Sequence, residues 1–339
     1  MSGFLNLWRP QVYHGHGRKR GFFEGWYFKL VDASESHRYA VIPGVFLAKA
    51  EGSSHAFVQT LDGVSGYTSY HRYPLSEFRA STRDFEIQIG PNHFRADRLT
   101  LDLDNPGGHM AGQLQFRDLV PWPISWASPG IMGWYAFAPF MECYHGIVSL
   151  DHRISGWLEV QGKPVDFTGG HGYTEKDWGQ AFPRAWIWMQ SNHFAQPGAC
   201  FTASVADIPW IGRAFRGFII GLWHGGKLYR LATYTGARIT TLQLTDTHVL
   251  WDVVGQGKQG HQTSPYRLEI RTSRAEGGLL HAPARVAMLQ RVPETLTASI
   301  ELRLTRLDGA TEQVIFQGQG RHAGLEIAGS ITDLLDGSG

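Results

Sequence analysis

Hydrophobic and polar residues alternate in short segments along almost the whole chain, and this alternation predicts β-strands. Clusters of Gly, Pro, Asn or Asp separate the segments, as expected for turns, and helical periodicity is nearly absent. Many short strands at regular spacing are typical of sandwiches and barrels. The predicted strands cover residues 21–31, 39–48, 54–59, 85–89, 94–103 and 109–116 in the first half, and 185–194, 200–207, 215–223, 227–235, 239–244, 248–254, 266–272, 299–307 and 313–320 in the second.

The two halves of the chain begin in a similar way. Gly25-Trp26-Tyr27-Phe28-Lys29 opens the first set of strands, and Ala185-Trp186-Ile187-Trp188-Met189 opens the second. A length of 339 residues also suggests about two domains of ordinary size. We therefore expect an all-β fold of two consecutive antiparallel β-barrels, one in residues 1–168 and one in 169–339, with a pocket at or near their junction.

Residues 169–194 are the part of the chain that is densest in reactive and polar side chains. A charged triplet, Glu175-Lys176-Asp177, stands between Tyr173 and Trp178. The strand that follows alternates, so two indoles and two amides share one face: Trp186, Trp188, Gln190 and Asn192. An apolar surface with a few placed polar groups is typical of a small-molecule site. The simpler interpretation is a charged loop followed by a half-buried strand.

Composition narrows the range of partners. A net charge of +1 gives no electrostatic basis for binding nucleic acid. The one local basic run, Arg18-Lys19-Arg20, fits a solvated surface or a weak contact with lipid headgroups. Cys143 and Cys200 are too few for a disulfide framework, and we expect buried free thiols. Without an apolar signal sequence or a long apolar span, a cytoplasmic protein is expected, soluble or peripheral to a membrane.

Several short motifs match cofactor sites only by chance. Gly255-x-Gly257-x-x-Gly260 fits a dinucleotide pattern, but a strand follows it where a helix is required. Gly225-Gly226, inside a partial phosphate-loop match, predicts a two-residue hairpin turn. His14-x-His16 lacks a partner carboxylate at ligand spacing. We therefore expect neither a metal nor an organic cofactor.

Three groups of residues, in order along roughly residues 10–235, resemble the tocopherol cyclase family. They are Phe22-Phe23-Glu24-Gly25-Trp26-Tyr27-Phe28-Lys29; Gly133-Trp134 through Pro139, with Glu142 and His145; and Tyr173-x-Glu175-Lys176-x-Trp178-Gly179, with Phe182-Pro183, Trp186-x-Trp188 and Gln190-x-Asn192-x-Phe194. The resemblance implies two lipocalin-like barrels and closure of a chroman ring on a prenylated quinol by alkene protonation. The wider group includes carotenoid hydratases and fungal Diels–Alderases. Two departures leave the substrate open: Asp177 replaces the Asn of the plant pattern, and a plastid transit peptide is lacking.

Protonating an alkene requires an acid in a dry, aromatic setting. The candidate acids are Glu24, Glu142, Glu175 and Asp177. Glu24, between Phe23 and Trp26, is favoured because burial raises a carboxyl pKa, and Asp177 is the rival. Lys176 would lower the pKa of a neighbouring carboxyl, and an ion pair of Glu175 with Lys176 that only fixes the interdomain linker is the structural alternative. Candidate substrate-binding residues are Trp26, Tyr27, Trp134, His145, Tyr173, Lys176, Trp178, Trp186, Trp188, Gln190 and Asn192.

Two functions from different classes follow. The first is a cyclase that acts on a prenylated phenol, quinol or related isoprenoid. The second is a non-catalytic, lipocalin-like carrier, for which the same aromatic cavity suffices and the carboxylates are structural. In both cases the partner is a hydrophobic small molecule, nucleic acid is excluded, and peripheral membrane contact and the oligomeric state stay open.

Overall fold

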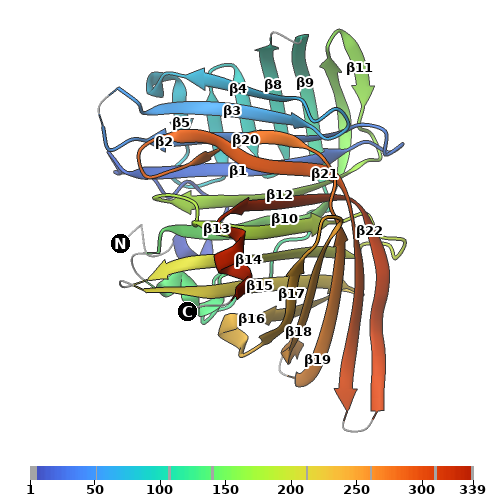
Figure 1. The fold of residues 1–339 in the computed structure, drawn as a ribbon. Coiled ribbons are helices and arrows are strands. Elements are labelled where there is room, and N and C mark those ends of the chain that lie inside the picture. The colour runs from blue at the N-terminus through green and yellow to red at the C-terminus, as the bar shows by residue number, and fades with distance from the viewer. Residues whose placement is uncertain are drawn as a thin grey trace. The chain divides into compact units, whose positions relative to one another are not determined.

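The computed structural model describes residues 6–50, 52–105, 108–138, 141–210, 213–259, 262–308 and 311–336. It divides into two compact units, one formed by Met1–Phe182 with Gly278–Arg291 and the other by Pro183–Gly277 with Val292–Gly339. Both are built from antiparallel strands, so the predicted all-β class with two β-sheet domains is confirmed (Figure 1). Within the described ranges, no helix is long and apolar enough to span a bilayer.

The first unit is a sheet in the order β4-β3-β2-β1-β12-β10-β9-β8-β7-β6-β5, with β11 paired to β10. Thus β12, the last of these strands in sequence, lies between β1 and β10 (Figure 1). The strands are β1 (Phe22–Val31), β2 (Arg38–Leu47), β3 (His55–Asp62), β4 (Thr68–Tyr73), β5 (Phe78–Ala80), β6 (Glu86–Ile89), β7 (Asn92–Arg95), β8 (Arg98–Asn105), β9 (Gly108–Arg117), β10 (Cys143–Val160), β11 (Lys163–Asp166) and β12 (His171–Gly179). Three 3-10 turns accompany them: η1 (Asn6–Trp8), η2 (Leu75–Glu77) and η3 (Gly133–Phe137).

One hydrophobic core fills the inner side of this sheet. Alternate residues of β1, namely Trp26, Phe28 and Leu30, are fully buried in it, together with apolar residues from β2 to β10. Because side chains alternate along a strand, the intervening residues of β1 point to the outer face. The inner face of the unit therefore consists of aromatic and aliphatic side chains, and polar groups there need a partner.

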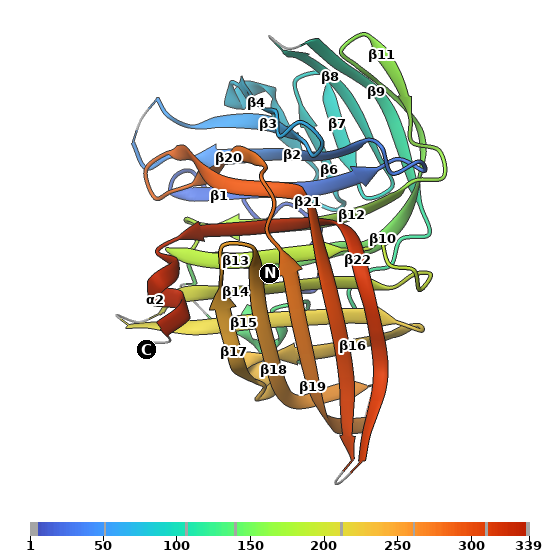
Figure 2. The same cartoon turned by 45° about the vertical axis from the view of Figure 1, so that its right-hand side comes forward.

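The second unit has the order β16-β15-β14-β13-β22-β21-β19-β18-β17, and an additional pairing of Arg230 with Lys258 joins β16 to β18 (Figure 2). Ile187 and Met189 of β13 contribute to its core. Its elements are β13 (Ala185–Ser191), β14 (Cys200–Trp210), β15 (Arg213–His224), β16 (Lys227–Ala232), η4 (Thr233–Thr235), β17 (Arg238–Leu244), β18 (His248–Gln259), β19 (Gln262–Ser273), β21 (Met288–Asp308), β22 (Thr311–Gly329) and α2 (Ile331–Asp336).

The predicted motif assignments in the second unit can be checked. Gly225 and Gly226 both have positive φ, 58° and 72°, and join β15 to β16 as the predicted two-residue turn. Gly255 and Gly257 lie within β18, which pairs with β19 as a hairpin and not with a helix. Gly260, like Pro139 of the family pattern, lies outside the described residues.

The observed division of the chain differs from the expected boundary at residues 168 and 169. It falls between Phe182 and Pro183, because β12 pairs with both β1 and β10 and so belongs to the first sheet. The segment Gly278–Arg291, which contains β20 (Gly278–Pro283), also belongs to the first unit. There the Gln59 amide bonds the backbone of His281 twice, at 3.0 Å each. Neither the inserted strand nor this return segment has a local sequence signal.

Candidate functional site

Strand β12 carries polar side chains on both of its faces. Its alternation places Tyr173, Glu175 and Asp177 on the outer face, and Thr174, Lys176 and Trp178 on the inner face toward the hydrophobic core. Consecutive residues of the charged triplet therefore point in opposite directions. Two separate clusters result, and the chemistry of each can be described by itself.

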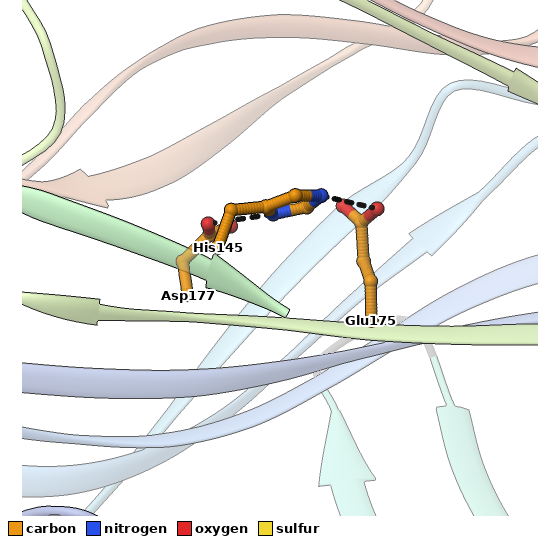
Figure 3. A group of neighbouring side chains, drawn as sticks. All are labelled: His145, Glu175 and Asp177. Carbon is orange, nitrogen blue, oxygen red and sulfur yellow. Dashed lines mark hydrogen bonds and ion pairs between the residues drawn. The ribbon is translucent and has the colours of Figure 1, made fainter. Parts of the chain in front are cut away.

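The outer cluster is centred on His145 of β10, which pairs in register with Asp177. The imidazole Nδ1 lies 2.9 Å from Asp177 Oδ1, and Nε2 lies 3.5 Å from Glu175 Oε2 (Figure 3). The Tyr173 hydroxyl donates a hydrogen bond to the same Glu175 oxygen. The Glu175 carboxyl is buried, whereas Asp177 is partly open to solvent.

This geometry fixes where a proton can reside. If Asp177 is ionised, it accepts the Nδ1–H of His145, as in other carboxylate–histidine pairs. The opposite ring nitrogen, Nε2, lies 3.5 Å from the Glu175 oxygen that accepts the Tyr173 hydroxyl. Asp177, His145 and Glu175 consequently form a chain of titratable side chains that runs from a partly exposed carboxyl to a buried one.

Neighbouring strands complete the outer cluster. Tyr27 pairs in register with Glu175, and the fully buried Lys29 pairs with Tyr173, so both lie on the same outer face. The Cys143 thiol is 3.9 Å from Asp177 Oδ1, and burial raises the pKa of this thiol well above its usual value. Cys143 therefore acts as a neutral donor to Asp177 and not as a thiolate nucleophile.

His145, Glu175 and Asp177 also satisfy a geometric condition for holding a metal ion. Each offers one ligand atom, and these atoms all lie within 4.8 Å of one another. An imidazole and two carboxylates suit a divalent cation. The same three groups are at present joined by direct contacts to each other, and the Tyr173 hydroxyl occupies one Glu175 oxygen.

The inner cluster is a buried ion pair between Glu24 of β1 and Lys176. Both side chains are completely inaccessible to solvent. The Lys176 ammonium also donates to the Val12 carbonyl and to His14 Nδ1, the latter at 3.0 Å, and it lies 4.9 Å and 4.8 Å from the ring centroids of Trp26 and Trp178. This cluster ties the N-terminal segment to the inner side of the sheet.

Glu24 is the proton donor that the sequence favours, but its surroundings keep it ionised instead of protonated. Burial alone would raise its pKa, but the Lys176 charge and the hydrogen bonds from His14 outweigh burial and lower it. The His14 backbone N–H donates to both carboxylate oxygens, at 2.8 and 3.1 Å. Burial lowers the Lys176 pKa to about 8, and the Glu24 charge opposes that effect. Glu24 is therefore an ionised carboxylate that anchors a lysine.

The expected ion pair of Glu175 with Lys176 is replaced by this pairing of Lys176 with Glu24. Trp26 and Trp178 belong to the inner cluster. Trp26 stacks on Phe85 with ring centroids 5.7 Å apart, and Trp178 stacks on His14 with ring centroids 4.3 Å apart. The local sequence did not indicate His14 as their partner, because its contacts depend on pairing strands far apart in sequence.

The remaining candidates lie elsewhere. Glu142 forms an ion pair with the exposed Arg285, and Trp134 is an exposed residue of η3. Trp186, Trp188 and Gln190 share the face of β13 opposite to the core residues Ile187 and Met189, as the alternation predicted, and all three are buried. Asn192 follows the end of β13, and its side-chain oxygen contacts His193 Nδ1 at 3.0 Å. These four residues belong to the second unit.

Comparison with known proteins places the site in a family context. The model of the tocopherol cyclase-like family matches residues 109–329, which include His145 and the whole of β12. Chloroplastic tocopherol cyclase of Zea mays is 28% identical over 209 residues, 58% of this chain and 41% of that protein. A probable chloroplastic tocopherol cyclase of Oryza sativa subsp. japonica is 28% identical over 207 residues, 58% of this chain and 42% of that one. The matched region thus spans less than half the length of these relatives.

Solved structures support the fold. The crystal structure of CghA with Sch210972 has a TM-score of 0.54 at 12% identity, over 91% of this chain and 89% of that one. At this level of identity the likeness concerns the fold alone.

Proposed function

The chain belongs to the tocopherol cyclase-like family, and we propose that it is an enzyme that protonates the alkene of a prenylated phenol or quinol and closes an oxygen heterocycle. The observation that carries the proposal is the buried Glu175 carboxyl. It is held by the Tyr173 hydroxyl and His145 Nε2, and the His145 ring is in turn positioned by Asp177.

Glu175 is the proposed general acid. In the first step its O–H bond breaks, and the proton forms a C–H bond with the less substituted alkene carbon, which leaves a tertiary carbocation. In the second step the phenol oxygen forms a C–O bond to that cation. The phenol proton is released to the ionised Glu175, either directly or through His145, so the substrate is isomerised with no change in its atoms. A positioned acid of this kind typically contributes about 10²–10⁴-fold to the rate.

The surroundings of Glu175 fit such a step. The carboxyl is almost inaccessible to solvent. Tyr27 and Tyr173 lie on the same face, and an aromatic ring stabilises an adjacent cation by about 0.5–2 kcal/mol. The partly exposed Asp177 gives the chain a route by which the proton is replaced after turnover. The names of the two plant relatives support the class of substrate.

The test is to incubate the purified full chain with a prenylated hydroquinone and to measure bound substrate and chroman product separately. Glu175→Gln keeps the shape of the side chain, so we expect binding within a factor of a few and ring closure slowed by about 10²–10⁴-fold. Glu142→Gln is the matched control, because it makes the same chemical change in an ion pair outside the cluster. Equal rates for wild type and Glu175→Gln would exclude Glu175 as the acid.

The same assay separates an enzyme from a carrier. A wild-type protein that binds the hydroquinone but forms no chroman with any prenylated phenol would support the carrier function. Addition of a chelator or of a divalent cation distinguishes the third possibility for the cluster. If activity required the cation, and Glu175→Gln abolished cation binding, His145, Glu175 and Asp177 would be metal ligands and the acid would have to be sought elsewhere.

A further inference from the structure

The first unit carries an exposed aromatic surface that the proposed chemistry does not use. We define it by Trp8 of η1, by Ile124 and Trp126 of a proline-rich loop at residues 121–130, and by Trp134 and Phe137 of η3. Trp126 is 88% exposed and Trp134 53% exposed. Trp122, in the same loop, is buried, so the loop is anchored by one tryptophan and presents another to solvent. Large apolar groups gathered on a surface mark an interaction site.

Direct contacts between its side chains hold the aromatic surface together. The Trp8 ring contacts the rings of Trp126 and Phe137, with centroids 5.9 and 5.6 Å apart, and its indole N–H donates to the Ser125 carbonyl at 3.1 Å. These contacts hold the N-terminal turn against a loop more than 100 positions later in the chain. The rings of Trp8, Trp126 and Phe137 are therefore fixed in one group.

The charged residues of the two segments that form this surface indicate which kind of partner binds it. Residues 119–141 contain no charged side chain, and residues 1–23 contain Arg9, Arg18, Lys19 and Arg20 but no Asp or Glu. Arg18, Lys19 and Arg20 are all exposed. The charge of Arg18 reaches Tyr144, where it opposes the rise in pKa that burial causes, and the Tyr144 hydroxyl donates to Ala138 beside η3 at 2.9 Å. The basic run belongs to the same N-terminal segment as Trp8 and follows it by ten to twelve positions.

We propose that the aromatic surface and the adjacent run Arg18-Lys19-Arg20 dock the protein onto the surface of an anionic lipid bilayer. Tryptophan and phenylalanine partition into the interface between headgroups and acyl chains, and basic residues beside them are attracted to anionic headgroups. The two segments contribute no acidic side chain that would repel such headgroups, and the exposed Asp84 beside this turn is paired with Arg9 at 3.7 Å. This inference goes beyond the proposed reaction and does not depend on it.

The experiment is flotation of the full chain with phosphatidylcholine vesicles, with and without phosphatidylglycerol, and no substrate present. We expect binding to the anionic vesicles, loss of about tenfold in affinity for Trp126→Ser, and loss of about a hundredfold for Arg18→Gln/Lys19→Gln/Arg20→Gln, since each basic residue contributes about 1 kcal/mol near such a surface. In about 1 M salt, where the Debye length falls to about 3 Å, the difference between the two vesicle types should vanish.

Trp157→Ser is the matched control, because Trp157 is 55% exposed on β10, outside the aromatic surface. It should leave vesicle binding unchanged. Absence of wild-type binding to anionic vesicles would overturn the proposal, as would an equal effect of Trp157→Ser and Trp126→Ser. A concentration-dependent dimer in sedimentation velocity that Trp126→Ser dissociates would assign the surface to a second copy of the chain instead. Thermal melts of each variant establish that the fold is kept.

Discussion

The two faces of β12 carry clusters built from the same kinds of side chain but suited to different tasks. On the inner face, Glu24 and Lys176 are fully buried, oppositely charged and in direct contact. On the outer face, Glu175 accepts the Tyr173 hydroxyl and one of its oxygens lies 3.5 Å from His145 Nε2; the buried Lys29 lies on the same face, and the cluster opens toward solvent at Asp177. A carboxyl that faces an ammonium is held ionised, whereas one that faces a hydroxyl and an imidazole can carry a proton.

This difference explains why the two carboxylates cannot exchange roles. The charge of Lys176 offsets the burial of Glu24 and lowers the pKa of that carboxyl, so Glu24 is not suited to donate a proton. The inner cluster is consequently expected to matter for folding and the outer one for chemistry. Each of the following experiments is designed to break or to sharpen that division.

The largest effect is expected for Lys176→Met. Removal of one partner of a buried ion pair leaves Glu24 charged and unpaired in the core, which typically costs about 3–5 kcal/mol. Chemical denaturation should show this loss in the free energy of unfolding. In the double variant Glu24→Leu/Lys176→Met much of the loss should be recovered, since no charge is left buried. If Lys176→Met were as stable as wild type, the inner cluster would not be the structural one.

The second-largest effect is expected on the rate of ring closure and not on stability. Asp177→Ala removes the carboxylate that orients His145, so we expect ring closure to fall by about a hundredfold, as for a displaced catalytic group; Asp177→Asn, which restores the Asn of the plant pattern, should be milder. The pH dependence of the rate should shift as well, because the proton chain ends at this residue. A purely structural Asp177 would alter the melting temperature and leave the pH profile unchanged.

Sequence patterns predicted the all-β class and named Tyr27, His145, Tyr173, Glu175 and Asp177 of the outer cluster among the candidates, but not Lys29 or Cys143. They could not select the acid, because the choice depends on Lys176 facing Glu24 from 152 positions away. That contact exists only because β12 inserts between β1 and β10, a pairing that no local pattern encodes. Alternation alone, applied to the triplet, would have separated Lys176 from Glu175 once residues 171–179 were known to be a strand.

The pKa values of His152 and His171, which lie on the two sides of the sheet, should be shifted in opposite directions. Burial lowers the pKa of His152, which packs on Phe116, from 6.5 to about 3, so below pH 6.5 the unfolded chain binds a proton that the folded chain does not. Stability should therefore fall by about 2 kcal/mol between pH 7 and 5 from this residue alone.

His152→Leu should reduce this loss of stability at acid pH, which can be measured by chemical denaturation at a series of pH values. The hydrogen bond to Asp151 raises the pKa of His171, which adds stability at pH values below 6.5 that is lost as the pH rises through the folded pKa. His171→Gln should accordingly make the free energy of unfolding fall more steeply as the pH is lowered. Parallel slopes for the two variants would contradict the assignment of opposite environments.

The smallest effect is expected for Arg285→Gln. Arg285 pairs with Glu142, as Lys176 pairs with Glu24, but its side chain is 63% exposed. Water screens an exposed pair, and such pairs typically contribute about 0–1 kcal/mol. The free energy of unfolding should change by no more than this, and added salt should remove the difference between variant and wild type. Compared with Lys176→Met, the variant separates the effect of burial from that of charge pairing. A loss as large as that of Lys176→Met would mean that the segment Gly278–Arg291 depends on this contact for its place in the first unit.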